Sequence, residues 1–600
     1  MVEPMDQDLL DYPFDADLIL RKKRSIKRDL LSKTPSIKKR IAVLGGPTTA
    51  EIVDILELFL LRADIGAEFL QSEFNKVEED SLFGNPELEA FQPEILLIFT
   101  TQMNVKYWPG LGDTNGAATD CAEREILRFR SWWDALQARY VCPIIQNNFE
   151  EPHLRLFGNL DAWDERGRVH YIRDLNQRLA AEARARKGLF LHDLARDAAR
   201  FGLDRWHDRR LWFLGKYGMA MEAVPFVAHS LAAEIKAMLG KSSKTLVLDL
   251  DNTLWGGVIG DDGVGGIQLG QETPQGEAYT ALQQYALDLN RRGVILAVAS
   301  KNETANALEG FKHPDTVLKA GDFAAFKANW DPKHENLIAI GAELSLGLDS
   351  LVFLDDNPVE RAIVRQGAPG VCVPEVGDEA ADYPLILDRS GVFETVSLTA
   401  DDMVRAKQYA ANTQRDLARA SFPDYGAFLD SLEMTGEIGR FKEIYLDRIT
   451  QLTNKSNQFN LTTRRYTESE VREVMGAPDK IGFYGRLKDK YGDNGLVSVV
   501  IGEVKEEEVE LVLWLMSCRV LKRGMEHAMF DAVAEEARGR GLKRLRGTYL
   551  PTPKNGMVRE FYSGLGFNRE SISNEGVSRW VLELDTAGRK KNNHIKIVNA

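Results

Sequence analysis

Cysteines are scarce in this sequence, and none of them lies in a spacing that builds a site. The chain has four cysteines and no Cys-x-x-Cys pair. This excludes a disulfide framework and gives no zinc-ligand spacing. Long apolar runs are missing too, because stretches such as Ile95–Phe99 are far shorter than the roughly 20 residues that cross a bilayer. We therefore expect no membrane-spanning segment.

An excess of positive charge is absent as well. The 90 Asp and Glu outnumber the 76 Lys and Arg, which gives a formal net charge of -14. Such a balance argues against nucleic acid as the main ligand. The first residues, with Asp6 and Asp8 among them, also lack the basic-then-apolar order of a signal peptide. The sequence thus predicts a cytoplasmic protein that binds neither nucleic acid nor a membrane.

The composition is that of an ordinary globular protein. With 44% apolar and 28% charged residues, and 49 Gly and 21 Pro among 600 positions, the chain is neither disordered nor collagen-like. At about 150 residues per domain, its length predicts several domains. Residues 21–40 hold ten Lys or Arg and one Asp. This segment fits either an amphipathic helix packed on the body or a docking surface for an acidic partner.

The order of predicted elements indicates α/β domains followed by an α+β domain. Short apolar strands such as Ile41–Leu44 and Leu351–Leu354 alternate with amphipathic stretches, which is the rhythm of a parallel sheet. Further on, we expect a strand within Ile438–Ile449 and an antiparallel hairpin of Val497–Val504 with Val509–Met516. The predicted divisions are a basic helical segment (1–40), an α/β domain (41–240), a central α/β domain (241–385), a linker with an α+β domain (386–588) and a flexible tail (589–600).

The most informative stretch is the predicted strand Leu246–Leu250, which carries carboxylates at its end. Asp249 and Asp251 are two positions apart, so they share one face of the extended chain. Open α/β sheets bind their ligands at the carboxyl ends of the strands. Two carboxylates this close repel each other unless a cation or a shared proton relieves them, and Mg²⁺ prefers such oxygens. We therefore expect Mg²⁺ and a phosphate group at this edge.

Three later segments provide groups of matching chemistry. The apolar strand Val294–Ala299 ends in Ser300-Lys301-Asn302, whose hydroxyl and amide can donate hydrogen bonds to phosphate oxygens. Lys333 opens a predicted helix and can offset the charge on a phosphoryl group. The strand Leu351–Leu354 ends in Asp355-Asp356, a second acidic pair suited to the same cation.

These motifs, in this order, resemble the haloacid dehalogenase (HAD) superfamily of phosphoryl-transfer enzymes. The resemblance implies that Asp249 is the nucleophile that forms an aspartyl-phosphate. It implies that Asp251 is the general acid and base, and that Lys333 is the catalytic lysine that neutralises charge. The substrate-binding residues that it implies are Thr253, Ser300, Lys301 and Asn302.

The same resemblance implies a Mg²⁺ site and one choice between lysines. The implied metal ligands are Asp249, Asp355, Asp356 and, through its backbone carbonyl, Asp251. Lys327 is a rival for the lysine role. Lys333 is preferred because its distance from Asp355 leaves room for one helix and one strand.

The sequence resembles one branch of this superfamily more closely than the superfamily as a whole. The phrase Asp-Asn-Thr-Leu-Trp-Gly-Gly-Val from Asp251, with Asn329-Trp330 and Phe353–Glu360, closely resembles the FkbH-like proteins. Fewer than fifty residues separate Thr253 from Ser300, which leaves no room for a cap domain beside the crossover helix. An uncapped site could admit a carrier protein. The branch implies an enzyme that removes phosphate from 1,3-bisphosphoglycerate and loads its glyceryl group onto the phosphopantetheine thiol of an acyl carrier protein in polyketide-type biosynthesis.

One position departs from that branch. Its glyceryl-loading members often have Cys just before the Ser-Lys-Asn element, whereas this sequence has Ala299. Acyl transfer through a thiol at this position is therefore excluded. Direct attack by the carrier thiol, a plain phosphatase reaction and a relay through Cys518 stay open. A lone cysteine beside an apolar run such as Leu513–Met516 is usually a core residue.

The C-terminal region resembles the GNAT acyltransferases, chiefly through the run Asn555–Phe567. This implies Asn555 and Tyr562 as acyl- or pantetheine-binding residues, with CoA or the phosphopantetheine of a carrier as the ligand. Leu521 and Glu526 depart from that family's pyrophosphate-binding loop. A role in holding a pantetheine arm or a carrier is therefore preferred to acetyl transfer, with a pure scaffold as the alternative.

The N-terminal region resembles the SGNH hydrolases in its order of elements. Gly45-Gly46-Pro47 stands where that family has its nucleophilic serine, while His207 lies in an Asp-x-x-His block. Without the serine the triad lacks its nucleophile, unless Thr48 takes that role. We therefore expect a catalytically inactive domain.

The predicted fold class is α/β: an uncapped HAD-type parallel sheet flanked by an SGNH-like α/β domain and a GNAT-like α+β domain. The predicted function is Mg²⁺-dependent dephosphorylation of an acyl phosphate and transfer of its acyl group to an acyl carrier protein. A HAD phosphatase of a small phosphorylated metabolite and a non-catalytic carrier scaffold are the alternatives.

Overall fold

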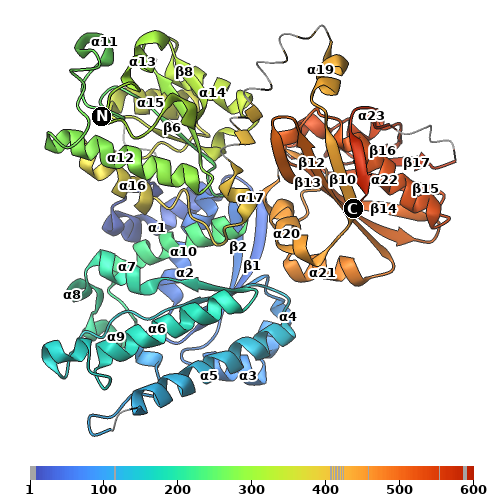
Figure 1. The fold of residues 1–600 in the computed structure, drawn as a ribbon. Helices are drawn as coiled ribbons and strands as arrows, with labels where there is room; N and C mark the ends of the chain where they lie inside the picture. The colour runs from blue at the N-terminus through green and yellow to red at the C-terminus, as the bar shows by residue number, and fades with distance from the viewer. Residues whose placement is uncertain are drawn as a thin grey trace. The chain divides into compact units, whose positions relative to one another are not determined.

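The chain forms two compact units, Met1–Ala237 and Met238–Ala600 (Figure 1). The computed structural model describes residues 8–113, 116–405, 408–409, 411–412, 415, 419, 422, 424–456, 458–552, 554–585 and 591–599. Among these, no helix combines the length and the apolar character needed to cross a membrane.

The first unit is built on a five-stranded parallel sheet with the order β2-β1-β3-β4-β5. Its strands are β1 (Ile37–Gly45), β2 (Ile65–Gln71), β3 (Ile95–Phe99), β4 (Ile144–Asn147) and β5 (Leu189–His192). Its helices are α1 (Ala16–Leu30), α2 (Ala50–Arg62), α3 (Val77–Phe83), α4 (Pro86–Phe91), α5 (Ala117–Arg139), α6 (Arg168–Ala185), α7 (Leu194–Phe201), α8 (Leu203–Trp206), α9 (Arg209–Gly215) and α10 (Val224–Met238). Every residue of β3 is buried, as expected for an apolar strand covered on both faces of a parallel sheet.

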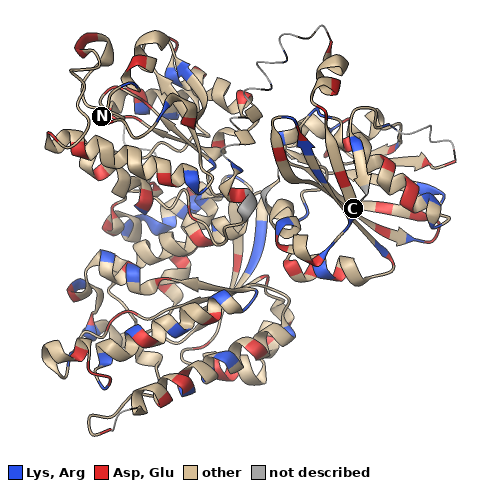
Figure 2. Ribbon diagram, in the orientation of Figure 1, with Lys and Arg blue, Asp and Glu red and all other residues tan. Residues whose placement is uncertain are grey.

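The basic segment before this sheet contains a helix that packs on the unit. In α1, Ile19 and Ile26 are buried. Lys23 forms ion pairs with two carboxylates of α2, at 2.7 Å from Glu51 and 2.8 Å from Asp54. Figure 2 marks the charged residues of these helices, of which α1 carries mainly Lys and Arg and α2 mainly Asp and Glu. The contacts favour the packed amphipathic helix over a free docking surface.

The second unit begins with a four-stranded parallel sheet in the order β8-β7-β6-β9. Its strands are β6 (Thr245–Leu248), β7 (Ile295–Ser300), β8 (Phe323–Ala328) and β9 (Leu351–Leu354). Its helices are α11 (Ile259–Asp262), α12 (Pro274–Arg291), α13 (Thr304–Gly310), α14 (Lys333–Glu343), α15 (Pro358–Gly367) and α16 (Tyr383–Arg389). Only the short α11 and an isolated bridge between Gly256 and Gln268 stand between β6 and α12. No cap domain is inserted at this point, where every residue is described.

The rest of the second unit is an α+β domain around a mixed sheet. The strand order is β16-β17-β15-β14-β13-β12-β10-β18, and β11 also pairs with β14. The strands are β10 (Thr435–Arg440), β11 (Phe459–Asn460), β12 (Lys480–Asp489), β13 (Gly492–Lys505), β14 (Glu508–Met516), β15 (Arg544–Tyr549), β16 (Asn568–Ile572), β17 (Ser578–Glu583) and β18 (Lys596–Asn599). The helices are α17 (Ala400–Met403), α19 (Tyr425–Ser431), α20 (Leu446–Lys455), α21 (Glu468–Gly476), α22 (Met525–Gly539) and α23 (Phe561–Gly564). The predicted hairpin is confirmed as the antiparallel pair β13–β14.

Strands β14 and β15 make only a short parallel contact. They pair only over Glu508–Leu511. Beyond that point β11 pairs with Leu515 and Met516 of β14, and the amide of Leu550 donates to the carbonyl of Leu461. The segment around β11 therefore fills the gap between the diverging strands.

Two predictions for this domain are wrong. The tail was expected to be flexible, but its described residues 591–599 bury Ile595 and add β18 to the edge of β10, because that edge offers unpaired backbone groups. The strand expected within Ile438–Ile449 ends at Arg440. The next residues form α20, whose buried Leu446, Ile449 and Leu452 recur at helical spacing. Residues 589, 590 and 600 lie outside the described part.

Candidate phosphoryl-transfer site

Side chains from three strands meet at the carboxyl edge of the sheet β8-β7-β6-β9. Asp249 follows β6, Ser300 ends β7 and Asp355 follows β9. Since β6 lies between β7 and β9 and all three run in parallel, their ends are neighbours. The amide of Asp249 donates to the carbonyl of Leu354 at 3.0 Å, which fixes the β6 and β9 ends side by side. This is the edge at which open α/β sheets bind ligands.

A buried lysine lies between two of the carboxylates. Lys333, the first residue of α14, places Nζ 2.9 Å from Asp249 Oδ2 and 2.6 Å from Asp355 Oδ2. All three side chains are less than a tenth exposed. Burial alone would lower the pKa of Lys333, but the two carboxylates outweigh it and raise that pKa. The lysine is therefore a permanent cation at the site.

The rival Lys327 lies elsewhere. It is on β8, and its Nζ pairs with Glu343 Oε2 at 2.7 Å. The preference for Lys333 thus agrees with the geometry.

The carboxylates form a group suited to a divalent cation. Oxygens of Asp249, Asp355 and Asp356 lie within 4.8 Å of one another, the one such group of three among the described residues. Asp249 Oδ1 is buried and has no hydrogen-bond donor. Burial, with the charge of Asp249, raises the pKa of Asp355 to about 6 although Lys333 opposes the shift. An orphaned carboxylate oxygen in an all-oxygen group is what a hard cation such as Mg²⁺ takes.

The side chain of Asp251 is held apart from that group. Its Oδ1 accepts hydrogen bonds from Trp255 Nε1 at 2.8 Å and from the amide of Ile259 at 3.0 Å, while Oδ2 accepts from Asn302 Nδ2 at 3.0 Å. Burial raises the pKa of Asp251 above its usual range. A raised pKa is a property that suits a general acid.

The loop after β6 is fixed by its own hydrogen bonds. Thr253 Oγ1 donates to Asp356 Oδ1 at 3.0 Å and accepts from the Asp356 amide at 3.1 Å. Asn252 adopts a left-handed φ of 55°, and its Oδ1 accepts from the amide of Gly257 at 2.9 Å. Thr253 therefore orders the acidic loop after β9 rather than facing open solvent.

The three side chains of the Ser-Lys-Asn element do not all face the site. Ser300 is buried at the end of β7, and Asn302 holds Asp251. Lys301 points elsewhere, since its Nζ forms an ion pair with Glu360 Oε1 at 2.6 Å. The structure thus brings Ser300 and Asn302 to the site and ties Lys301 to the start of α15.

Two residues that shape the site were not predicted. Trp255 orients Asp251, as described above. Arg361 Nη1 donates to the backbone carbonyls of Asp355 and Asp356 at 2.9 and 2.7 Å, which fixes the loop that carries both carboxylates. Both residues lie inside the quoted FkbH-like motif or directly after it, so their position in the sequence was the available signal.

Neither of the two positions considered for an acyl-transfer thiol offers one at this edge. Ala299 is fully buried in the apolar cluster that contains Val247 and Phe353. Cys518 Sγ lies 2.9 Å from Tyr409 Oη and close to Lys244, which precedes the amino end of β6. The cysteine is therefore near the strand end opposite to Asp249, which argues against a relay through it.

The two residues predicted to bind an acyl group in the α+β domain are interior residues. Asn555 is fully buried, and its Nδ2 donates to the carbonyls of Asn460 and Leu550, which ties the β11 segment to the end of β15. Tyr562 is 1% exposed and its ring closely approaches Gly547. In this conformation both side chains hold the fold together, and a ligand contact by either of them stays a prediction.

The sheet edge of the first unit contains no assembled triad among its described residues. Thr48 Oγ1 donates to the carbonyl of Gly215 at 2.6 Å. His207 Nε2 lies 3.3 Å from the carbonyl of Glu151, and burial lowers its pKa. The hydroxyl and the imidazole therefore have separate partners.

Comparisons with known proteins add to this geometry. The family model described as FkbH, N-terminal domain, matches residues 40–236. The N-terminal part of the protein BF1531 from Bacteroides fragilis, which contains a phosphatase domain and was crystallised in complex with Mg, is 31% identical. That match covers 63% of this chain and 98% of the other, with a TM-score of 0.57. The chain belongs to the FkbH-like family. Its central domain is a HAD-type phosphatase domain.

Weaker similarities concern the C-terminal part of this FkbH-like protein. The ribosomal-protein-S18-alanine N-acetyltransferase from Escherichia coli matches 26% of the chain at 15% identity, with a TM-score of 0.21. The GNAT domain of S. lividans PAT matches 24% at 14% identity, also at 0.21. Because these TM-scores are so low, the two matches support no conclusion beyond the strand order described above. No curated protein matches the chain significantly.

Proposed function

We propose that this FkbH-like protein dephosphorylates a small acyl phosphate such as 1,3-bisphosphoglycerate and passes its acyl group to the thiol of an acyl carrier protein. The observation that carries the proposal is the Asp249–Lys333–Asp355 cluster, with a free carboxylate oxygen on Asp249, in an uncapped FkbH-like site. The carboxylates of Asp249, Asp355 and Asp356 would hold Mg²⁺. When bound, Mg²⁺ would offset the negative charge of the phosphoryl group.

Phosphate removal follows from the placement of the two aspartates after β6. One carboxylate oxygen of Asp249 attacks phosphorus, and the bond from phosphorus to the leaving oxygen breaks. Asp251 donates a proton to that oxygen, and then accepts one from the water that hydrolyses the aspartyl-phosphate. Lys333 offsets the negative charge throughout, because its ammonium already lies 2.9 Å from the nucleophilic carboxylate.

Acyl transfer requires a different bond of the same substrate. If Asp249 attacked the phosphorus of the acyl phosphate, the product would be a carboxylate, which no longer acylates a thiol. The thiol must instead attack the carbonyl carbon and displace inorganic phosphate. A substrate with two phosphates satisfies both requirements, since Asp249 can remove the ester phosphate while the acyl phosphate supplies the activated carbonyl.

The carrier thiol is the proposed acceptor because the chain offers none of its own at the site. Ala299 has no thiol and is buried, and Cys518 lies near the opposite end of β6. The absence of a cap before α12 leaves the carboxyl edge open to a pantetheine arm. A phosphatase without acyl transfer is the second candidate, and the alanine at position 299 is the observation that favours it.

Intact-mass analysis of a holo acyl carrier protein tests the proposal. The carrier is incubated with the full chain, Mg²⁺ and 1,3-bisphosphoglycerate generated in situ, with Asp249→Asn alongside. The proposal predicts a glyceryl adduct without phosphate in the presence of the natural chain. Phosphate release with no adduct would support the plain phosphatase instead, and neither product would contradict both.

A further inference from the structure

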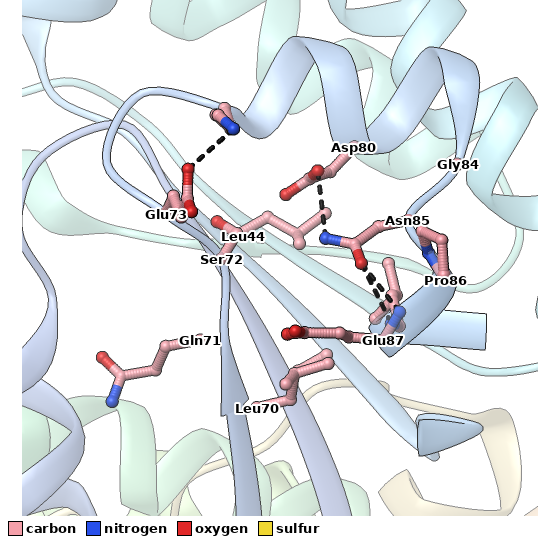
Figure 3. Close-up of a pocket in the computed structure, with 13 residues that line it drawn as sticks. Leu44, Leu70, Gln71, Ser72, Glu73, Asp80, Gly84, Asn85, Pro86 and Glu87 are labelled. Atoms are coloured by element: carbon pink, nitrogen blue, oxygen red, sulfur yellow. Dashed lines mark hydrogen bonds and ion pairs between the residues drawn. The ribbon is translucent and has the colours of Figure 1, made fainter. Parts of the chain in front are cut away.

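A cavity of about 420 Å³ lies in the first unit, apart from the phosphoryl-transfer site (Figure 3). It opens between the β1–β2 face of the sheet and the segment that carries α3 and α4. Its floor is apolar, with Ala42 and Leu44 of β1 beside Leu70 of β2. Ala42 and Leu70 are register partners, so these aliphatic side chains share one face. The volume suits a small organic molecule.

The charges around this cavity are mostly negative. Glu73 and Glu87 are exposed at its rim, and Asp80 of α3 is buried inside it. The one basic residue of the lining, Lys76, is engaged by Glu73, with Nζ 2.7 Å from Oε2. The lining thus combines an apolar floor with three carboxylates and one lysine, and that lysine is paired with Glu73.

Asp80 carries a buried oxygen without a partner. The side chain is 6% exposed, and Figure 3 shows it pointing into the cavity above Leu44. Its Oδ1 accepts from Asn85 Nδ2 at 3.1 Å, whereas Oδ2 is buried and has no hydrogen-bond partner. The Asn85 amide cannot turn to help, because its Oδ1 caps α4 by accepting from the amides of Glu87 and Leu88. A buried carboxylate oxygen left unpaired is costly, so a donor from a ligand would be strongly favoured.

Two ligand classes do not fit. An anion would meet the negative lining. A metal ion would need several ligand atoms close together, and among the described residues only the Asp249 site groups three such atoms. A cation with an apolar body meets both the carboxylate and the aliphatic floor.

We propose that this cavity binds a small primary ammonium compound whose alkyl body lies on Leu44 and Leu70 and whose ammonium group pairs with Asp80. The site is independent of the phosphoryl-transfer chemistry. Burial raises the pKa of Asp80, and a bound ammonium would bring that pKa down again.

Isothermal titration calorimetry on the full chain tests this site. The probes are pentylamine and 1,5-diaminopentane, with pentanol as the uncharged analogue of the same length. The variants are Asp80→Asn, which keeps the shape, and Leu70→Trp, which fills the cavity and keeps the charge. Glu79→Gln is the matched control, because Glu79 is an exposed acid on the same helix outside the cavity.

The expected result is millimolar or tighter binding of at least one amine and none of pentanol. Asp80→Asn should weaken the amine at least about tenfold, since a hydrogen bond to a charged group is lost, and Glu79→Gln should leave it within about twofold. Thermal unfolding shows whether Asp80→Asn is folded. If it is not, Leu70→Trp replaces it in the test and should abolish binding of the amine. Failure of both amines to bind, equal binding of pentanol, or full affinity in a folded Asp80→Asn or Leu70→Trp protein would overturn the proposal.

Discussion

The two parallel sheets of this protein end in opposite ways at their carboxyl edges. At the edge of β6, Asp249 keeps a buried oxygen without a donor. At the edge of β1, Thr48 is bonded to a backbone carbonyl, and the Asn147 amide exchanges two hydrogen bonds with the backbone of Thr100. Two sheets of similar architecture thus differ at this edge. One keeps a buried polar oxygen available to a ligand, whereas the named polar side chains of the other are hydrogen-bonded within the protein.

The difference lies in charge as well as in hydrogen bonds. The phosphoryl-transfer edge holds one cation among several carboxylates, which leaves it negative until a metal binds. At the first unit's edge the acid Glu150 is fully buried, and burial raises its pKa to about 8. Burial therefore weakens the negative charge that Glu150 contributes to this edge near pH 7.

The largest effect is expected from removing the nucleophile. Asp249→Asn should lower phosphate release by at least about 10³-fold, because the amide cannot form the aspartyl-phosphate. Release of inorganic phosphate under saturating Mg²⁺ measures this. Asp261→Asn, a change in a separate acid of the same domain, should leave the rate within about twofold. An Asp249→Asn protein with near-normal rate would place catalysis elsewhere.

The next effect separates the two lysines. Lys333→Met should lower the rate about 10²- to 10³-fold, because the site loses the cation that offsets charge on the phosphoryl group. Lys327→Met should have little effect on the rate, since its ammonium is paired with Glu343. Parallel measurement of kcat for both variants checks this. Equal losses would mean that the position of Lys333 between two carboxylates has no catalytic consequence.

A pH effect is expected at the other edge. Burial alone would lower the pKa of His192, at the end of β5, but the carboxylates of Asp197 and Glu234 raise it to about 10. The unfolded value is near 6.5, so this stabilisation is complete below about pH 6.5 and is lost as the pH rises toward 10. The free energy of unfolding of the natural chain, measured relative to that of His192→Gln, should therefore fall by on the order of 2–4 kcal/mol as the pH rises from about 6.5 toward 10.

Scanning calorimetry of the full chain and of His192→Gln at pH 6.5 and 9.5 measures that difference. Comparison with the variant cancels the titration of groups that do not interact with His192. A difference between the two proteins that stays constant with pH would show that His192 is not a buried cation.

The smallest effect concerns the hydroxyl of the first unit. Thr48→Ala should cost about 1 kcal/mol of stability, the usual value of one hydrogen bond, and should leave phosphate release unchanged. Thermal unfolding and the phosphate assay measure the two quantities. A lower rate of phosphate release in this variant would mean that the sheet edge of the first unit also contributes to catalysis.

The sequence predicted most of the phosphoryl-transfer site because its residues follow short apolar strands. Asp249, Ser300 and Asp355 each end such a strand, and strand order in a parallel sheet then brings them together. The spacing before Asp355 also selected Lys333. The hydrogen bond of Trp255 to Asp251 could not be predicted, since it depends on how the loop folds back.

The failures came from long-range packing. Strand β18 forms only because β10 has a free edge, which nothing local to residues 596–599 reveals. Asn555 and Tyr562 matched a ligand-binding pattern, yet Asn555 is bonded to the β11 segment, distant in sequence, and Tyr562 is buried against Gly547. The sequence did not single out Asp80, because it directly follows two other acidic residues, Glu78 and Glu79. Only the fold shows that Asp80 is the one of the three that is buried.

The central claim is that Asp249 carries the phosphoryl group during turnover. Rapid acid quenching of the full chain with Mg²⁺ and a phosphorylated substrate, followed by peptide mass analysis, tests it most directly. The account predicts one added phosphoryl group on the peptide that contains Asp249, absent in Asp249→Asn, and none on the peptide that contains Thr48. A phosphoryl group on any other residue, or its persistence in Asp249→Asn, would contradict it.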